Sequence, residues 1–162
     1  MADAYTKTKL EHLTEYMVSH LKTGVLDNKI DAWQENAKLV ISGEDRGNGG
    51  MVIAEWQYNA VISVEGFPHQ LFDPRYLLAS VACWLSEYDH DRASTELEDP
   101  SISVDVLDDG TADVSIEVEL SEVIEMIPDP DGLITYQGQQ YRVQTAPIYT
   151  AEEAEIINEA NG

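Results

Sequence analysis

The segment from 51 to 64 alternates strictly between apolar and mixed positions, and this pattern constrains the fold more than any other feature. Every even position in the segment is apolar: Val52, Ala54, Trp56, Tyr58, Ala60, Ile62 and Val64. The odd positions include Glu55, Gln57, Asn59 and Ser63. A period of two places alternate side chains on one face of a strand. We therefore expect a strand with one buried face, long enough to bend or to project past the body of the domain.

Two amphipathic helices accompany this strand. The first covers 6–23, with an apolar stripe made of Leu10, Leu13, Met17 and Leu21. Thr23-Gly24 ends it, because glycine tolerates the left-handed conformation of a helix end. The second begins at Asp73-Pro74, where aspartate caps free N–H groups and proline fits the first turn. Its wide apolar face predicts burial across the sheet: Leu77, Leu78, Val81, Trp84, Leu85 and Tyr88.

Residues 101–120 predict a hairpin whose register follows from the pattern. Apolar residues occupy even positions on both sides of the turn, and directly opposed residues share a face. A two-residue turn at 109–110 would place Val106 opposite Asp113, so that an apolar and a charged side chain would share one face. A three-residue loop, 108–110, opposes Val106 to Ala112 instead, and its last residue, Gly110, suits a left-handed conformation.

The stretches around these elements are less regular. Residues 29–42 predict a strand or bent strand with Trp33, Leu39, Val40 and Ile41 as its apolar members. Four glycines between 43 and 50 predict a flexible loop. Residues 121–132 contain Pro128 and Pro130 and predict another loop.

A last hairpin is predicted at 133–143, turning around Gly138-Gln139 and pairing Tyr136 with Tyr141 and Ile134 with Val143. Thr150 and Glu153 have the spacing of a capping box for a short C-terminal helix. Together the elements indicate a single α+β domain over 1–145, with a mainly antiparallel sheet and two principal helices packed on it. We expect residues 146–162 to be a C-terminal extension that carries the short helix.

The sequence carries no pattern typical of a catalytic, cofactor-binding or metal site. His12, His20, His69 and His90 lack the spacing of metal ligands. The acidic stretch from Asp105 fails as a calcium loop, because its third and twelfth positions are apolar. The glycine-rich loop lacks the Gly-Lys-Ser/Thr ending of a phosphate cradle, and no Gly-x-Ser-x-Gly elbow occurs. We predict that the chain is not an enzyme and uses no cofactor.

Cys83 is the only cysteine, so no disulfide can form within one chain. Its apolar neighbours favour a place in the core over a role as a reactive thiol. The first residues lack the apolar core of a secretion signal, and no run of 18 apolar residues could span a membrane. These features predict that the chain stays in the cytoplasm of the cell that makes it and does not enter a membrane.

The chain is strongly acidic, with a net charge of −22 from 31 acids and 9 Lys and Arg residues. Sixteen acids and one base, Arg92, lie between Glu87 and Asp131. Such a surface repels phosphate and disfavours binding to nucleic acid. One interpretation of this charge is solubility or adaptation to a salty habitat. Two further interpretations are a passage through which DNA moves without sticking and a surface that mimics DNA.

The order of elements resembles the tail completion protein R family of contractile-tailed temperate bacteriophages. The resemblance covers roughly residues 51–143 and depends on the stretches 58–64, 66–67, 77–78, 83–87, 114–120 and 136–143, which read YNAVISV, GF, LL, CWLSE, VSIEVEL and YQGQQYRV. The loop at 43–50, the residues after 146 and the extreme acidity do not belong to it.

The resemblance implies a structural protein of the virion that assembles in the host cytoplasm. It implies a homo-oligomeric ring, hexameric in this family, that caps the tail tube and leaves a surface for head-neck connector proteins, with the sheath as a further neighbour. DNA passes through the lumen of such a ring without stable binding. Two alternatives stay open: a connector or neck protein of the same kind of virion, and an acidic DNA-mimic inhibitor.

Overall fold

The computed structural model describes residues 7–21, 30–45, 49–90, 92, 94 and 96–145. Within these ranges it contains two helices and one six-stranded sheet, which confirms the predicted α+β class. In chain order the elements are α1 (Lys9–His20), β1 (Ile30–Asp45), β2 (Met51–Phe67), α2 (Pro74–Tyr88), β3 (Ser101–Val106), β4 (Ala112–Pro128), β5 (Ile134–Tyr136) and β6 (Gln139–Thr145). The predicted C-terminal helix and the Thr23-Gly24 stop lie outside these ranges.

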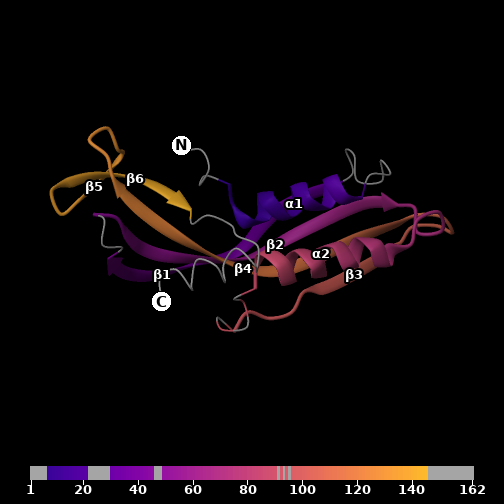
Figure 1. The fold of residues 1–162 in the computed structure, drawn as a ribbon. Coiled ribbons are helices and arrows are strands. Elements are labelled where there is room, and N and C mark those ends of the chain that lie inside the picture. The colour runs from indigo at the N-terminus through magenta and orange to yellow at the C-terminus, as the bar shows by residue number, and fades with distance from the viewer. Residues whose placement is uncertain are drawn as a thin grey trace.

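The sheet is antiparallel, and two 17-residue strands, β2 and β4, form its centre. The strand order is β1-β2-β4-β6-β5, and β3 also pairs with β4. β3 follows the first part of β4, from Ala112 to Glu117, while β6 follows its last part, from Ile124 to Pro128. Figure 1 shows the consequence: α1 and α2 lie along one part of the long strands, and the β5–β6 hairpin lies at the other end.

The core lies between the two helices and one face of β2 and β4. The even positions of β2 from Val52 to Val64 are buried as the alternation predicts, apart from half-buried Trp56. Even positions of β4 from Ala112 to Leu120 face the same way and are buried with them. Trp84 and Leu77 from α2 and Leu13 from α1 fill the space above this face with no exposed surface.

Local sequence explains where the helices begin. The Thr8 side chain accepts a hydrogen bond from the backbone N–H of Glu11, and Asp73 accepts one from Arg75. Each contact satisfies an N–H group that the first helical turn leaves without a partner. The Asp73 cap is therefore confirmed.

Strands extend into part of two predicted loops. β1 continues through Asp45, into the stretch expected to be a glycine-rich loop. β4 continues to Pro128, so that the loop predicted for 121–132 is wrong in its first part. Strand pairing on both sides explains why β4 extends this far, because Met126 pairs with Met51 on β2 and with Val143 on β6. Pro128 is tolerated since it ends the strand.

The two predicted hairpins differ in outcome. In the first, Val106 pairs with Ala112 and Leu107 bonds to Thr111, as predicted. Gly110, however, is not left-handed. The Asp108 carboxylate closes this turn instead, accepting hydrogen bonds from the N–H groups of Gly110 and Thr111 at 2.8 and 2.7 Å.

The register predicted for the last hairpin is wrong. Tyr136 pairs with Gln139, and Ile134 pairs with Tyr141. The turn is Gln137-Gly138, with φ values of +51° and +79°. Two consecutive positive φ values are typical of a two-residue turn that matches the twist of a hairpin.

The placement predicted for Cys83 is also wrong, because its side chain is exposed. The buried residues of α2 are Leu77, Ser80, Val81, Trp84 and Leu85. Position 83 lies on a different side of the helix from these buried residues. Its side chain is therefore exposed, although its neighbours in sequence are apolar.

Candidate functional site

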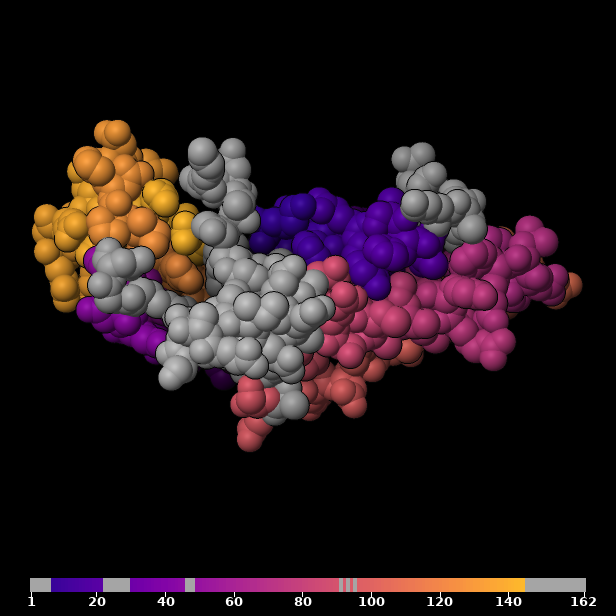
Figure 2. Space-filling view, viewed as in Figure 1, coloured from indigo at the N-terminus to yellow at the C-terminus, as the bar shows by residue number. Residues whose placement is uncertain are grey.

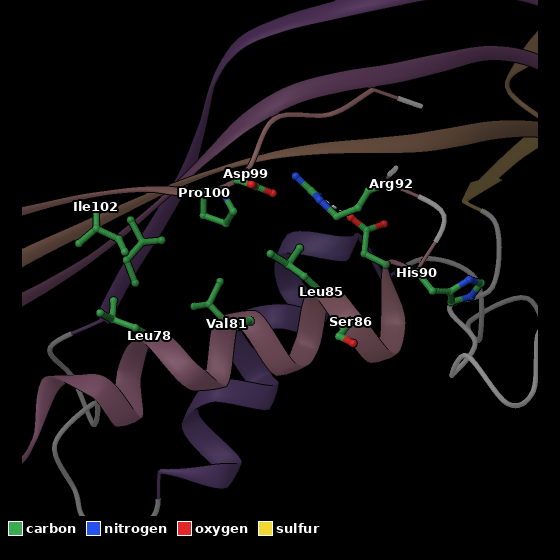
Figure 3. A pocket seen from close by; sticks show the side chains of 12 residues that line it. Leu78, Val81, Leu85, Ser86, His90, Arg92, Asp99, Pro100 and Ile102 are labelled. Carbon is green, nitrogen blue, oxygen red and sulfur yellow. Dashed lines mark hydrogen bonds and ion pairs between the residues drawn. The ribbon is translucent and has the colours of Figure 1, made fainter. Parts of the chain in front are cut away.

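A groove of about 460 Å³ lies between α2 and β3 (Figure 3). It exists because α2 packs over the centre of the sheet and leaves β3 uncovered: all six β3 residues are exposed. Leu78, Val81 and Leu85 of α2 point into the groove toward Pro100 and Ile102 (Figure 3). The remaining described lining residues are Ala82, Ser86, Asp89, His90, Arg92, Asp99 and Ile116.

A buried ion cluster closes one end of this groove. Asp89, directly after α2, keeps only 1% of its surface exposed. Its carboxylate accepts hydrogen bonds from Lys9 Nζ at 2.7 Å and from Arg92 Nη1 at 2.8 Å. Arg92 also donates to the backbone carbonyls of Glu119 and Glu98. The cluster thereby joins both helices, β4 and the approach to β3.

A second buried carboxylate, Glu122 on β4, lies beneath the start of α1. Tyr58 Oη donates a hydrogen bond of 2.5 Å to it, and the backbone N–H of Lys9 donates another of 3.0 Å. Burial raises the pKa of Glu122 above its usual range despite these donors. Burial, together with the neighbouring Glu122, also raises the pKa of the Tyr58 hydroxyl.

Both carboxylates are committed to internal partners. Glu122 does not line the groove, and the Asp89 oxygens that border it already accept from two cations. The rest of the groove is mainly apolar. The arrangement is therefore suited to binding apolar side chains rather than to moving a proton.

The histidines occupy separate places. His12 accepts a hydrogen bond at Nδ1 from the Trp84 indole, and burial lowers its pKa. His20 contacts the Tyr16 carbonyl, His69 Nε2 is buried without a described partner, and His90 borders the groove. Within the described ranges, no group of three His, Cys, Asp or Glu side chains could hold a metal ion.

The sheet face opposite the helices is acidic. Odd positions of β2 from Glu55 to Ser63 and of β4 from Asp113 to Val123 point to this face, together with the β1 and β3 residues that pair with them, and Trp33, Val40 and Val61 are among its apolar members. We call it the open face, and its carboxylates are Asp31, Glu35, Glu55, Asp105, Asp113, Glu117 and Glu119. Lys38 lies among them, paired with Gln57. The open face therefore repels polyanions.

Sequence reasoning predicted no ligand site and did not identify the groove. Ile102, Val104 and Val106 share a face with the apolar residues of β4, as the hairpin pattern predicts, yet these side chains are 48%, 57% and 64% exposed. Strand periodicity gives the face of a side chain but does not show whether a helix covers it.

Comparison with known proteins identifies relatives of the chain. The family model for the P2 phage tail completion protein R (GpR) matches residues 7–145. The chain is also 26% identical over 151 residues to an "uncharacterized 19.2 kDa protein in rep-hol intergenic region" of Haemophilus phage HP1, covering 93% of this chain and 90% of that protein. No solved structure matches significantly. Among the described residues, no helix is long and apolar enough to cross a membrane.

Proposed function

Because this chain belongs to the family of the P2 phage tail completion protein R, we propose that it caps the tail tube as a ring of identical subunits. The match over 7–145 carries this proposal, since it includes every described helix and strand. The ring has six subunits, ends the growth of the tube and presents a surface on which the neck assembles. Its place in the mature particle is the top of the tail.

The open face gives this ring a suitable lumen. DNA leaves the particle through the tail and must pass the cap without sticking to it. Seven carboxylates against one lysine, Lys38, give this sheet face a negative charge that repels phosphates. We propose that the open face borders the DNA path and that the helices lie outside it.

The role proposed here is structural and not catalytic. Family membership supports it, because tail completion is an assembly function. The buried groups support it too, because Asp89 and Glu122 bond to groups within the chain. Such networks fix the positions of helices and strands, as a rigid building block requires.

The test measures assembly and binding to tube ends. Identical subunits of charge −22 repel one another, and screening shortens this repulsion from about 30 Å at 0.01 M salt to about 8 Å at 0.15 M. We expect light scattering to show a monomer in dilute buffer and a closed ring at higher salt or on added tail tubes. Electron microscopy should place the ring at the tube end. Failure to bind tube ends at every salt concentration contradicts the proposal.

A further inference from the structure

The β5–β6 hairpin differs in charge from the rest of the molecule. The chain has no Asp or Glu from Gly132 to Ala151, whereas sixteen acids lie between Glu87 and Asp131. Arg142 is the only charged residue of the hairpin. A second acidic subunit therefore meets less repulsion at the hairpin than at surfaces rich in carboxylates.

One face of the hairpin is apolar and partly uncovered. Ile134 pairs with Tyr141, and the alternation of strands places Tyr136 and Val143 on the same face. Ile134 and Val143 are 41% and 54% exposed, and the neighbouring Leu133 is 98% exposed. The other face is polar and consists of Thr135, Gln140, Arg142 and Gln144. In Figure 2 the hairpin forms a lobe at one end of the molecule.

The hairpin and the α2–β3 groove both border free sheet edges. β5 pairs only with β6, and β3 pairs only with β4, so that one side of each has no strand partner among the described residues. A free edge can accept an extended segment, whose backbone forms the hydrogen bonds while alternate side chains enter adjoining pockets. The groove beside β3 is such a pocket, and its volume of about 460 Å³ accommodates several apolar side chains.

These two surfaces are complementary in chemistry and cannot meet within one chain. The groove is mainly apolar, with Arg92 and Asp99 at its edge, and the hairpin face that carries Ile134 and Val143 is apolar and has no charge. Figure 1 places the hairpin at one end of the sheet and β3 toward the other. Any occupation of the groove by a hairpin therefore involves a second copy.

We propose that the β5–β6 hairpin of one subunit docks in the α2–β3 groove of the next, adding β5 to the free edge of β3. The proposal rests on the proposed ring and names its interface. Hairpin and groove are different surfaces, so the contact is head-to-tail, and such contacts generate a ring when the rotation closes. The docking also explains the length of β2 and β4, since these strands place the hairpin away from the part of the sheet that the helices cover.

Three variants test the interface. Val143→Asp places a charge on the hairpin face, and Ile102→Asp places one in the groove. Leu71→Asp adds the same charge at a 90% exposed loop position outside both surfaces. Under conditions where the wild type assembles, we expect loss of the ring for the first two variants and none for the control. Thermal melts check folding, and Leu133→Asp replaces V143D if that variant does not fold.

Mixing the two defective variants gives the decisive result. V143D retains the wild-type groove, and I102D retains the wild-type hairpin. The hairpin of I102D can therefore dock in the groove of V143D, and no other contact can form. We expect sedimentation velocity to show that the mixture forms a 1:1 dimer and nothing larger, while each variant alone stays monomeric. A mixture that stays monomeric, or variants that still form rings, overturns the docking but not the ring. A wild type that self-associates neither in salt nor on added tail tubes overturns self-docking, and whether it binds tube ends decides the capping role separately.

Discussion

At the scale of single residues, Trp84 is the largest fully buried side chain among the described residues. Its side chain is fully buried, and its indole Nε1 donates to His12 Nδ1 at 2.8 Å. We expect Trp84→Ala to lower the free energy of unfolding by about 3–5 kcal/mol, the usual cost of truncating a buried aromatic. Denaturant titration measures this. Trp33→Ala, at a 41% exposed position, is the control and should change little; equal effects would contradict the assignment.

Glu122 predicts a specific pH dependence. Burial raises its pKa in the folded state above the unfolded value of 4.5. Below pH 4.5 its full contribution to stability is present, and this contribution is lost as pH rises through the folded pKa. Glu122→Gln removes this titration, so we expect the free energy of unfolding of the wild type, relative to E122Q, to fall as pH rises above 4.5. A constant difference across the pH series would contradict the buried, titrating carboxylate.

Glu122→Ala should behave differently from E122Q. It leaves the Tyr58 hydroxyl and the Lys9 N–H buried without their acceptor, at a cost of about 1–3 kcal/mol each. Glutamine can still accept from Lys9 and donate to Tyr58. The sequence did not indicate this site, because a carboxylate on an even strand position carries no sign of burial in so acidic a chain.

At the scale of elements, Gly132 is needed for the turn between β4 and β5. A Cβ atom there would lie 2.1 Å from the Tyr141 carbonyl oxygen, so the backbone would have to move. We expect Gly132→Ala to lower stability by about 1–3 kcal/mol, as for overpacking. It should also abolish ring formation, because the hairpin shifts.

Gly43→Ala is the matched control for this variant. A Cβ atom at that position meets nothing within 4 Å, and the residue has no positive φ. Thermal melts and light scattering should show a melting point and assembly close to those of the wild type. Equal behaviour of the two glycine variants would show that the close approach at Gly132 is not required.

The two hairpins show how far local pattern determines an element. The β3–β4 register was predictable because five apolar residues on β4 must share a face with those on β3. The last hairpin offers fewer such constraints, and polar residues between 137 and 140 fit more than one turn. Its register follows from left-handed Gln137 and Gly138 and from pairing of β6 with β4, and neither is local information.

At the scale of the whole molecule, fold class was predictable and the binding surfaces were not. Alternation and helix caps are local, so they give the number and type of elements. The groove depends on how far α2 reaches across the sheet, and the lobe depends on which strands extend beyond the helices. Both are relations between distant segments, which periodicity does not encode.

The open face gives the last prediction, which concerns DNA passage. Glu55 and Glu117 both point to this face, and replacing both with lysine raises the charge of each subunit by four. We expect particles assembled with E55K/E117K to eject DNA more slowly than wild-type particles, because lysines in the lumen bind the phosphates that carboxylates repel. The delay should shrink as salt rises, since screening weakens this attraction.

A control separates position from total charge. Glu87→Lys and Asp109→Lys change the charge equally, at an exposed position of α2 and in the β3–β4 turn. If the open face borders the DNA path, ejection measured by dye uptake slows for the first pair and not for this one. Equal slowing in both would assign the effect to total charge, and no slowing in either would place the open face away from the DNA. Position within the ring, rather than net charge, is therefore what the comparison isolates.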